Sequence, residues 1–209
     1  MKQLTLIITI LISGLSSLFS QQSTRNIPFT WDNATVYFML TDRFYNGDTS
    51  NDGAYGRQKN TKNHEMDFQG GDLKGLTAKI NEGYFDKLGV NAIWITAFYE
   101  QMHKGVGEFN YYGYHGYFTK DWSQMDKAMG SEADLREMVD AAHNHGIRII
   151  LDVVMNHSGY PIDGDGGYPL SWVRNNYEGY GDKVIYEPLA GLPDMRTEAT
   201  TSVELPQWL

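Results

Sequence analysis

The sequence predicts an α/β protein in which short buried strands alternate with amphipathic helices. Three apolar runs of strand-favouring residues, at 35–40, 91–97 and 148–154, are each followed by a polar or glycine-rich segment. Two segments between these runs carry apolar residues at helical spacing. Strand, helix, strand, helix, strand is the start of a repeating βα unit with a parallel sheet.

The first helix is expected to begin at Leu73 and to end at Gly89, where a left-handed turn favours a residue without Cβ. Gly83 inside this segment costs about 1 kcal/mol relative to alanine. The apolar residues recur every four positions, which places them on one face of a single helix: Leu76, Ile80, Tyr84 and Leu88.

The second helix has clear start and stop signals. Ser131 and Asp134 have the spacing of a capping box, and Gly146 ends the segment. The apolar face is predicted to consist of Leu135, Met138, Val139 and Ala142. Between the second strand and this helix, the aromatic and glycine-rich segment 98–130 is expected to be a loop.

Both a barrel and an open doubly wound sheet begin with this order of elements. Neither helix opens with a Gly-x-Gly-x-x-Gly turn, which disfavours a nucleotide-binding open sheet. Polar residues follow the strands at their carboxyl ends, where a (β/α)8 barrel carries its functional groups: Asp42, Arg43, Asn156 and His157. These positions favour a barrel, with its first strands and helices in residues 21–157. Prolines and glycines interrupt 158–209, which is predicted to start a domain inserted after the third strand.

The first residues have the layout of a secretory signal peptide. Lys2 precedes an apolar run from Leu4 to Leu18, and small residues follow near Ser20. This run is too short to cross about 30 Å of hydrocarbon stably. We therefore expect residues 1–20 to be cleaved, a secreted or periplasmic location, and no stable membrane insertion after cleavage. An uncleaved anchor is the alternative.

Composition narrows the possible partners. The chain has 17 basic and 26 acidic residues and a net charge of −9, so it would repel a phosphate backbone and nucleic acid is not expected as a partner. With 41% hydrophobic residues, the chain can form a sizeable core. It contains no cysteine, so neither a disulfide nor a lipid attached to cysteine is available. Stability must come from the core or from a bound metal.

The segment "DRFYNGDTSNDGA", residues 42–54, offers several oxygen ligands within a few residues: Asn46, Asp48, Asn51 and Asp52. Carboxylate and amide oxygens on a glycine-containing loop are typical of calcium sites. The spacing matches the opening of an EF-hand loop but then fails, because Lys59 stands where a bidentate glutamate is needed. The alternative is a polar turn in which Asn and Asp side chains cap their own backbone.

The segment "YYGYHGYFTKDW", residues 111–122, is rich in aromatic side chains separated by glycines. Sugars present apolar CH faces and hydroxyl groups, so a sugar site needs aromatic platforms with polar tips. Tyr114, His115 and Tyr117 are therefore candidates for sugar binding, and core packing is the alternative for each ring. Downstream, "ILDVVMNH" ends the third strand with Asp152, Asn156 and His157, which can bind a metal or a ligand hydroxyl. If Asp152 lies within the strand, its carboxylate needs an arginine or another hydrogen-bond partner.

Several of these segments together resemble the α-amylases of glycoside hydrolase family 13, and within that family the secreted or periplasmic bacterial enzymes. The similarity covers roughly Ala34 to Thr201, in the family's order. It is carried by "TDRFYNGD" (41–48), "GVNAIWIT" (89–96), "YHGYFTKDW" (114–122), "DVVMNH" (152–157) and "GLPDM" (191–195).

The resemblance implies that residues 21–157 are the N-terminal part, about three βα units, of a TIM (β/α)8 barrel. It also implies roles for individual residues. Tyr117 would stack on the glucose ring at the cleaved position, His157 would contact a hydroxyl of that glucose, His115 would lie nearby, and Asp152 would support the floor of the site. The resemblance also implies Ca²⁺ as a cofactor. One calcium would be shared by the barrel and the inserted domain through Asn156 and Asp194. A second, found in some members, would be bound by Asn46, Asp48, Asn51, Asp52, Gly70 and Asp72.

The family hydrolyses α-1,4-glucosidic bonds in starch-like α-glucans with retention, using carboxylates that follow the fourth, fifth and seventh strands. We expect these residues C-terminal to Leu209, so no catalytic residue is assigned within the chain, which we expect to be inactive alone. Two alternatives remain. One is a cyclodextrin-acting or transglycosylating relative, and the other is a non-catalytic, calcium-dependent glucan-binding protein.

Overall fold

The structure is a computed structural model that describes residues 28–57, 64–108, 110–160 and 192–195. The predicted signal peptide and most of the predicted inserted domain lie outside the described residues. The chain divides into two units, residues 1–33 and 34–209. In the first unit, the described residues include a 3-10 turn, η1 (Trp31–Asn33), in which the Asn33 Oδ1 accepts a hydrogen bond from the Thr30 amide at 3.1 Å.

The second unit contains the predicted parallel sheet. Its strands run in the order β1–β2–β5, with bounds Val36–Met39, Ala92–Ile95 and Arg148–Leu151. Phe38 pairs with Trp94, and Trp94 pairs with Ile150. The third strand is shorter than the predicted 148–154, so Asp152 lies just beyond the strand rather than within it.

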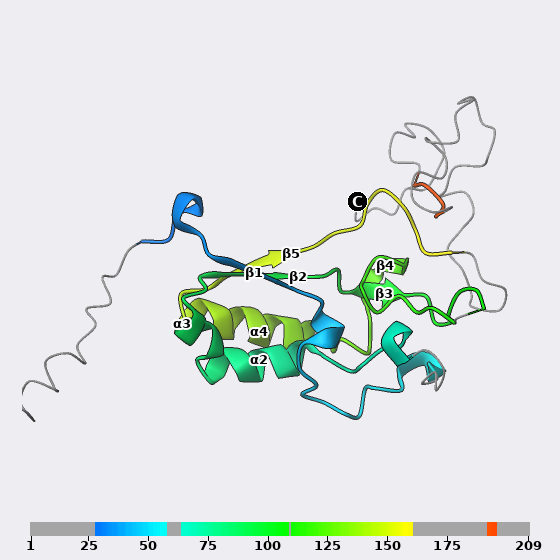
Figure 1. The fold of residues 1–209 in the computed structure, drawn as a ribbon, viewed down its shortest axis with the longest axis horizontal. Helices are drawn as coiled ribbons and strands as arrows, with labels where there is room; N and C mark the ends of the chain where they lie inside the picture. Colours follow the sequence, from blue (N-terminus) through cyan, green and yellow to red (C-terminus); the bar gives the residue numbers. More distant parts are fainter. Residues whose placement is uncertain (1–27, 58–63, 109, 161–191, 196–209) are drawn as a thin grey trace, which may run out of the picture. The chain divides into compact units, whose positions relative to one another are not determined.

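The helices lie together on one face of this sheet (Figure 1). They are α2 (Leu73–Asn81), α3 (Tyr84–Leu88) and α4 (Glu132–Asn144). Between helices and sheet lies a continuous core, whose fully buried members include Leu73, Leu76, Ile80, Ile93, Ile95 and Met138. The other face of the sheet carries apolar side chains that are substantially exposed, with Val36 at 45%, Phe38 at 49% and Trp94 at 38%. In a (β/α)8 barrel that face points to the interior.

The prediction of one continuous helix over 73–88 is wrong. Gly83 adopts a left-handed conformation with φ of 69°, which ends α2 and starts α3 in a new direction. The change of direction also changes the buried face after Gly83. Phe85 is fully buried, whereas Tyr84 and Leu88 are 38% and 51% exposed.

The second predicted helix is confirmed as α4. The Ser131 side chain accepts a hydrogen bond from the Asp134 amide, and the Asp134 carboxylate accepts one from the Ser131 amide, so the capping box is complete. Gly146 follows the helix with φ of 70°, as expected for a left-handed stop.

The segment predicted as a loop contains an antiparallel ribbon of β3 (Tyr99–Gln101) and β4 (Thr119–Met125). A buried ion pair fixes it, in which the Arg57 guanidinium contacts both carboxylate oxygens of Asp126 at 2.6 and 2.7 Å. That carboxylate also accepts a hydrogen bond from the Gln101 amide. The ribbon has register irregularities, and its strands lack the regular alternation by which sequence patterns reveal strands.

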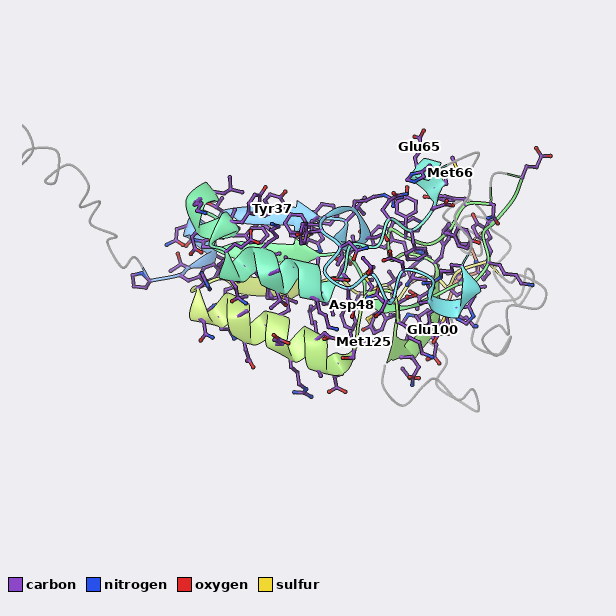
Figure 2. All side chains as sticks on the ribbon, turned by 90° about the horizontal axis from the view of Figure 1, so that it is seen from below. Tyr37, Asp48, Glu65, Met66, Glu100 and Met125 are labelled. Carbon is purple, nitrogen blue, oxygen red and sulfur yellow. The ribbon has the colours of Figure 1, made fainter. Side chains whose placement is uncertain are left out.

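Short 3-10 helices occur in the loops beside the sheet: η2 (Thr41–Arg43), η3 (Ala54–Gly56) and η4 (His64–Met66). Figure 2 shows Glu65 and Met66 together on η4, and Tyr37 on the first strand. Within the described part of the chain, no helix has the length and apolar character needed to cross a membrane.

A substitution at Gly75 in α2 can test how closely the loop after β1 packs on this helix. Alanine normally stabilises a helix interior by about 0.5–1 kcal/mol relative to glycine. Here a Cβ at Gly75 would lie 1.9 Å from the Tyr45 carbonyl oxygen and 3.0 Å from the Gly47 nitrogen. We therefore expect Gly75→Ala to destabilise the protein by about 2 kcal/mol.

The matched control is Gly53→Ala, because a Cβ there meets no atom within 4 Å and Gly53 has φ of −96°. Urea unfolding of the whole protein should show a change below about 0.5 kcal/mol for this control. A neutral or stabilising Gly75→Ala substitution would contradict the close packing of loop and helix.

Candidate functional site

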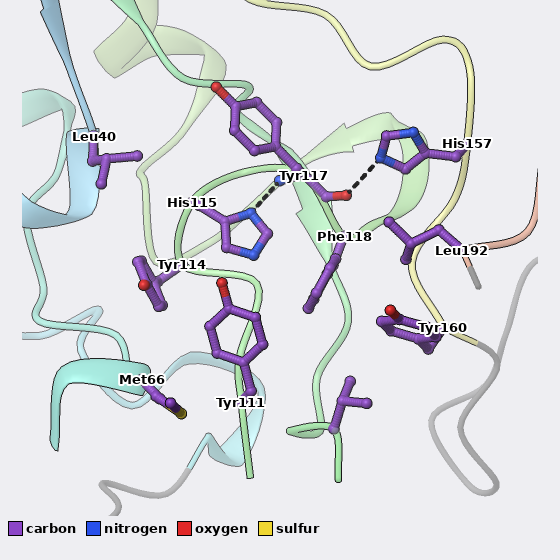
Figure 3. A pocket seen from close by; sticks show the side chains of 11 residues that line it. Leu40, Met66, Tyr111, Tyr114, His115, Tyr117, Phe118, His157, Tyr160 and Leu192 are labelled. Carbon is purple, nitrogen blue, oxygen red and sulfur yellow. Dashed lines mark hydrogen bonds between the residues drawn. The ribbon is translucent and has the colours of Figure 1, made fainter. Parts of the chain in front are cut away.

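A pocket of about 840 Å³ lies beside the carboxyl ends of the strands, and aromatic side chains dominate its walls (Figure 3). Segments far apart in sequence meet in it. Leu40 follows β1, Met66 belongs to η4, the aromatic segment contributes several rings, and His157 and Leu192 come from beyond β5. A largely apolar pocket with a few polar tips is the usual form of a small-molecule site.

The structure brings together the four residues assigned to sugar binding. The Tyr117 hydroxyl donates to the Asp152 Oδ2 at 3.1 Å, and the Tyr117 amide donates to the His115 Nδ1 at 3.0 Å. The His157 Nε2 lies 3.2 Å from the Tyr117 carbonyl oxygen, as the dashed lines in Figure 3 show. The rings of His115 and Tyr117 are stacked with centroids 5.4 Å apart. Asp152 thus finds its hydrogen-bond partner in Tyr117.

Hydrogen bonding fixes the tautomers of the two histidines. The His115 Nδ1 accepts from an amide, so the neutral ring carries its proton on Nε2 and can donate there. The His157 Nε2 faces a carbonyl oxygen and must be the donor, which leaves its Nδ1 as an acceptor. This Nδ1 is buried and has no hydrogen-bond partner among the described residues. It is an unsatisfied acceptor of a residue that lines the pocket.

Burial favours the neutral form of both rings. Burial is the main cause that lowers the pKa of His115 to about 4, with the positive charge of Arg43 and the neighbouring His157 as further causes. Burial also lowers the pKa of His157, against the opposing effect of its hydrogen bond to the Tyr117 carbonyl. The pKa of Tyr117 is raised to about 12 by burial and by the Asp152 charge, so its hydroxyl remains a donor at neutral pH.

The lowered pKa of His115 predicts a pH dependence of stability. Between pH 6.5 and about 4 the unfolded chain binds a proton at this residue and the folded protein does not. The contribution of His115 to stability is therefore fully present above pH 6.5 and is lost as the pH falls toward 4. We expect the Tm of the wild type to fall more between pH 7.5 and pH 5 than that of His115→Gln, whose amide does not titrate. Equal falls in differential scanning calorimetry would contradict this assignment.

Some residues of the pocket have no signal in the sequence. Leu40, Met66 and Leu192 are ordinary apolar residues in segments that only the fold brings together. Arg43 was recognisable in the sequence as a polar residue after the first strand. Its contact with the pocket residue Tyr114 was not recognisable there. Its guanidinium carbon lies 3.6 Å from the centroid of the Tyr114 ring.

The predicted calcium loop also converges in space. The Asn46 Nδ2 donates to the Asp52 Oδ1 at 2.7 Å, and a Cβ on Gly70 would lie within 2.5 Å of both of these atoms. The side-chain oxygens of Asn46 and Asn51 are buried and have no hydrogen-bond partner among the described residues. Buried carbonyl-type oxygens without donors are suited to a hard cation.

The carboxylates of this loop have other partners. Asp48 binds the Lys74 ammonium at 2.6 Å and the Ser50 amide at 3.0 Å. Asp72 caps α2 through the Gly75 amide and also accepts from the Gly47 and Asp48 amides. These contacts are those of the alternative interpretation, in which the polar residues cap the local backbone. Within the described part of the chain, no group of three or more His, Cys, Asp and Glu side chains forms a metal cluster.

The two residues assigned to the other calcium lie close together. The His157 and Asp194 backbones form an isolated antiparallel bridge, and the Met195 amide donates to the Asn156 carbonyl at 2.8 Å. Thus the structure brings the neighbourhood of Asn156 to that of Asp194, although residues 161–191 lie outside the described part.

Comparison with known proteins places these features in a family. Residues 38–164 match the sequence profile of the alpha-amylase catalytic domain. The chain belongs to the alpha-amylase family. A periplasmic alpha-amylase of Escherichia coli K12 is 54% identical over 93% of this chain and 37% of the relative. A cyclomaltodextrin glucanotransferase of Paenibacillus macerans is 36% identical over 62% of this chain and 18% of that relative.

Solved structures of the alpha-amylase family support the same conclusion. An Anoxybacillus alpha-amylase aligns with a TM-score of 0.63 at 29% identity, covering 81% of this chain and 35% of that structure. A gamma-cyclodextrin glucanotransferase from an alkalophilic Bacillus clarkii aligns with a TM-score of 0.66 at 28% identity, covering 78% and 27%. The predicted fold class is confirmed, because the parallel sheet and its helices correspond to part of the alpha-amylase barrel. The chain spans between 18% and 37% of the length of these relatives.

Proposed function

We propose that this alpha-amylase family protein is a glycoside hydrolase that cleaves α-1,4-glucosidic bonds in starch-like α-glucans with retention. The observation that carries the proposal is the hydrogen-bonded cluster of Tyr117, His115, His157 and Asp152, of which the first three line the aromatic pocket. A neutral donor, an acceptor without a partner among the described residues and a flat ring suit the hydroxyls and CH face of a glucose unit.

Each member of the cluster has a distinct proposed role. Tyr117 provides the stacking face, and its hydrogen bond to Asp152 fixes the ring orientation. The Nδ1 of His157 accepts a hydrogen bond from a glucose hydroxyl, and the Nε2 of His115 donates one. These residues bind and orient the sugar, and we assign no catalytic carboxylate among the described residues.

We propose calcium as the cofactor. The loop site would use Asn46, Asp48, Asn51, Asp52, Gly70 and Asp72, and the site shared with the inserted domain would use Asn156 and Asp194. The buried side-chain oxygens of Asn46 and Asn51 fit a hard cation, because they have no donor in the described part of the chain. Calcium there would hold the loop after β1 against α2, while Lys74 would compete for Asp48.

We also propose a secreted or periplasmic location, with residues 1–20 as signal peptide, 21–157 as barrel and 158–209 as inserted domain. The E. coli relative is described as periplasmic, and the apolar start of the chain is consistent with export. Edman sequencing of the protein isolated from its native host should begin near Gln21. A mature protein that still begins at Met1 would argue for an uncleaved anchor.

Product analysis of the whole protein on amylose and maltoheptaose tests the activity. Hydrolysis predicts new reducing ends, linear maltooligosaccharides and, by proton NMR at early times, the α-anomer. Cyclic or elongated products would favour the transglycosylating alternative. Binding without any change in the glucan would favour the non-catalytic glucan-binding protein, and neither binding nor cleavage would refute the proposal.

A further inference from the structure

Arg43 is held by an unusual number of contacts for a residue at the edge of a pocket. Its Nη1 contacts the Asp42 Oδ2 at 2.5 Å, and Asp42 is only 2% exposed. The same carboxylate accepts hydrogen bonds from the Gln69 and Gly70 amides at 2.9 and 3.1 Å. The guanidinium therefore has a fixed, charged anchor at the end of β1.

The Arg43 guanidinium also binds the backbone of η4 and of the residue that follows it. The Arg43 Nη1 donates to the Asp67 carbonyl at 2.7 Å, and the Nη2 donates to the Glu65 carbonyl at 2.6 Å. These two carbonyls flank Met66, whose side chain lines the pocket (Figure 3). Arg43 thus fixes the backbone on both sides of one wall residue.

The flat face of the same guanidinium covers a second wall residue. It lies 3.6 Å from the centre of the Tyr114 ring, which lines the pocket next to Tyr111 and His115. Figure 3 shows Tyr114, Tyr111 and Met66 on the same side of the pocket. One side chain therefore joins the strand end, η4 and the aromatic segment.

We infer that Arg43 is a positioning residue that sets the separation of Met66 and Tyr114, and so determines affinity for glucan on that side of the pocket rather than the rate of bond cleavage. The inference rests on the proposed function. Arginine suits this role because its planar fork can bind two carbonyls and stack on a ring at once, whereas a lysine ammonium cannot.

The test compares Arg43→Lys and Arg43→Met with the wild type in the whole protein, using KM and kcat on maltoheptaose. Loss of the planar guanidinium group should raise KM about tenfold in both variants and leave kcat within about twofold of the wild-type value. The control is Arg136→Lys, whose side chain is 75% exposed on α4 and should leave both constants unchanged. A KM within twofold of the wild type for Arg43→Lys would overturn the inference.

A background that carries two substitutions in the pocket wall separates positioning from general stability. If Arg43 acts through Tyr114 and Met66, the effect of Arg43→Met on KM should shrink at least severalfold in a Tyr114→Leu, Met66→Ala background. An undiminished effect there would overturn the inference. If the Arg43 variants do not fold, Tyr114→Leu decides: it removes the ring that the guanidinium covers and should raise KM, and an unchanged KM would overturn the inference. A wild type that neither binds nor cleaves glucan would instead refute the proposed function.

Discussion

Removal of divalent cations from the whole protein should lower its Tm by several degrees. A ligand present at a thousand times its Kd stabilises the folded state by about 4 kcal/mol, and 1 kcal/mol corresponds to about 2–4 °C for 150–250 residues and to less for a longer chain. The physical reason is local. Without a cation, the side-chain oxygens of Asn46 and Asn51 are buried with no donor among the described residues. Calorimetry with EDTA, and then with added Ca²⁺, measures the effect.

Asp52→Asn tests whether the loop is the source of this stabilisation. The amide oxygen can still accept the hydrogen bond from the Asn46 Nδ2, so the substitution mainly removes a negative charge from the proposed site. We expect a smaller Ca²⁺-dependent rise in Tm, with the remainder due to the site at Asn156 and Asp194. The control is Asp140→Asn on the exposed side of α4, which should respond to Ca²⁺ like the wild type. A wild-type Tm that EDTA does not change would refute the calcium proposal.

Tyr117→Leu should lower kcat/KM on maltoheptaose by about 100-fold or more. The substitution removes the proposed stacking face and leaves Asp152 without the hydroxyl that donates to it. Misplacement of a bound substrate by about 1 Å can by itself cost about 100-fold. Steady-state kinetics of the whole protein measure the loss.

The matched variant Tyr117→Phe keeps the ring and removes only the hydroxyl. One hydrogen bond to a charged group contributes about 1.5–3 kcal/mol, and Asp152 is only partly buried, so we expect a loss of about tenfold. A loss for Tyr117→Leu no larger than that for Tyr117→Phe would mean that the ring does not contact the sugar. In that case the proposed role of Tyr117 would be wrong.

The elements with local signals were predictable from the sequence. The capping box at Ser131 and the stop at Gly146 depend on backbone hydrogen bonds and on one positive φ, which neighbouring residues determine. The three parallel strands were recognisable as apolar runs, although β5 is shorter than predicted. The prediction of one continuous helix through Gly83 was wrong. The spacing of apolar residues alone does not reveal whether a glycine continues a helix or adopts a left-handed turn.

The ribbon of β3 and β4 could not be predicted in this way. Its strands are short and irregular, and a buried ion pair between Arg57 and Asp126 fixes it. The sequence separation of the two partners is large, so no local pattern indicates their contact. The same applies to Met66 and Leu192 in the pocket, which are recognisable only once the chain has folded around them.

The sequence by itself determined the α/β fold class, the resemblance to the alpha-amylases and the residue types available to bind a sugar or a cation. Only the tertiary structure decided that Tyr117 is the partner of Asp152, that His157 has a buried acceptor nitrogen without a partner among the described residues, and that Arg43 links two pocket walls. The physical reason is that residue types and local periodicity are properties of short segments. Hydrogen bonds, burial and charge interactions between distant segments exist only when the fold brings those atoms within a few ångströms.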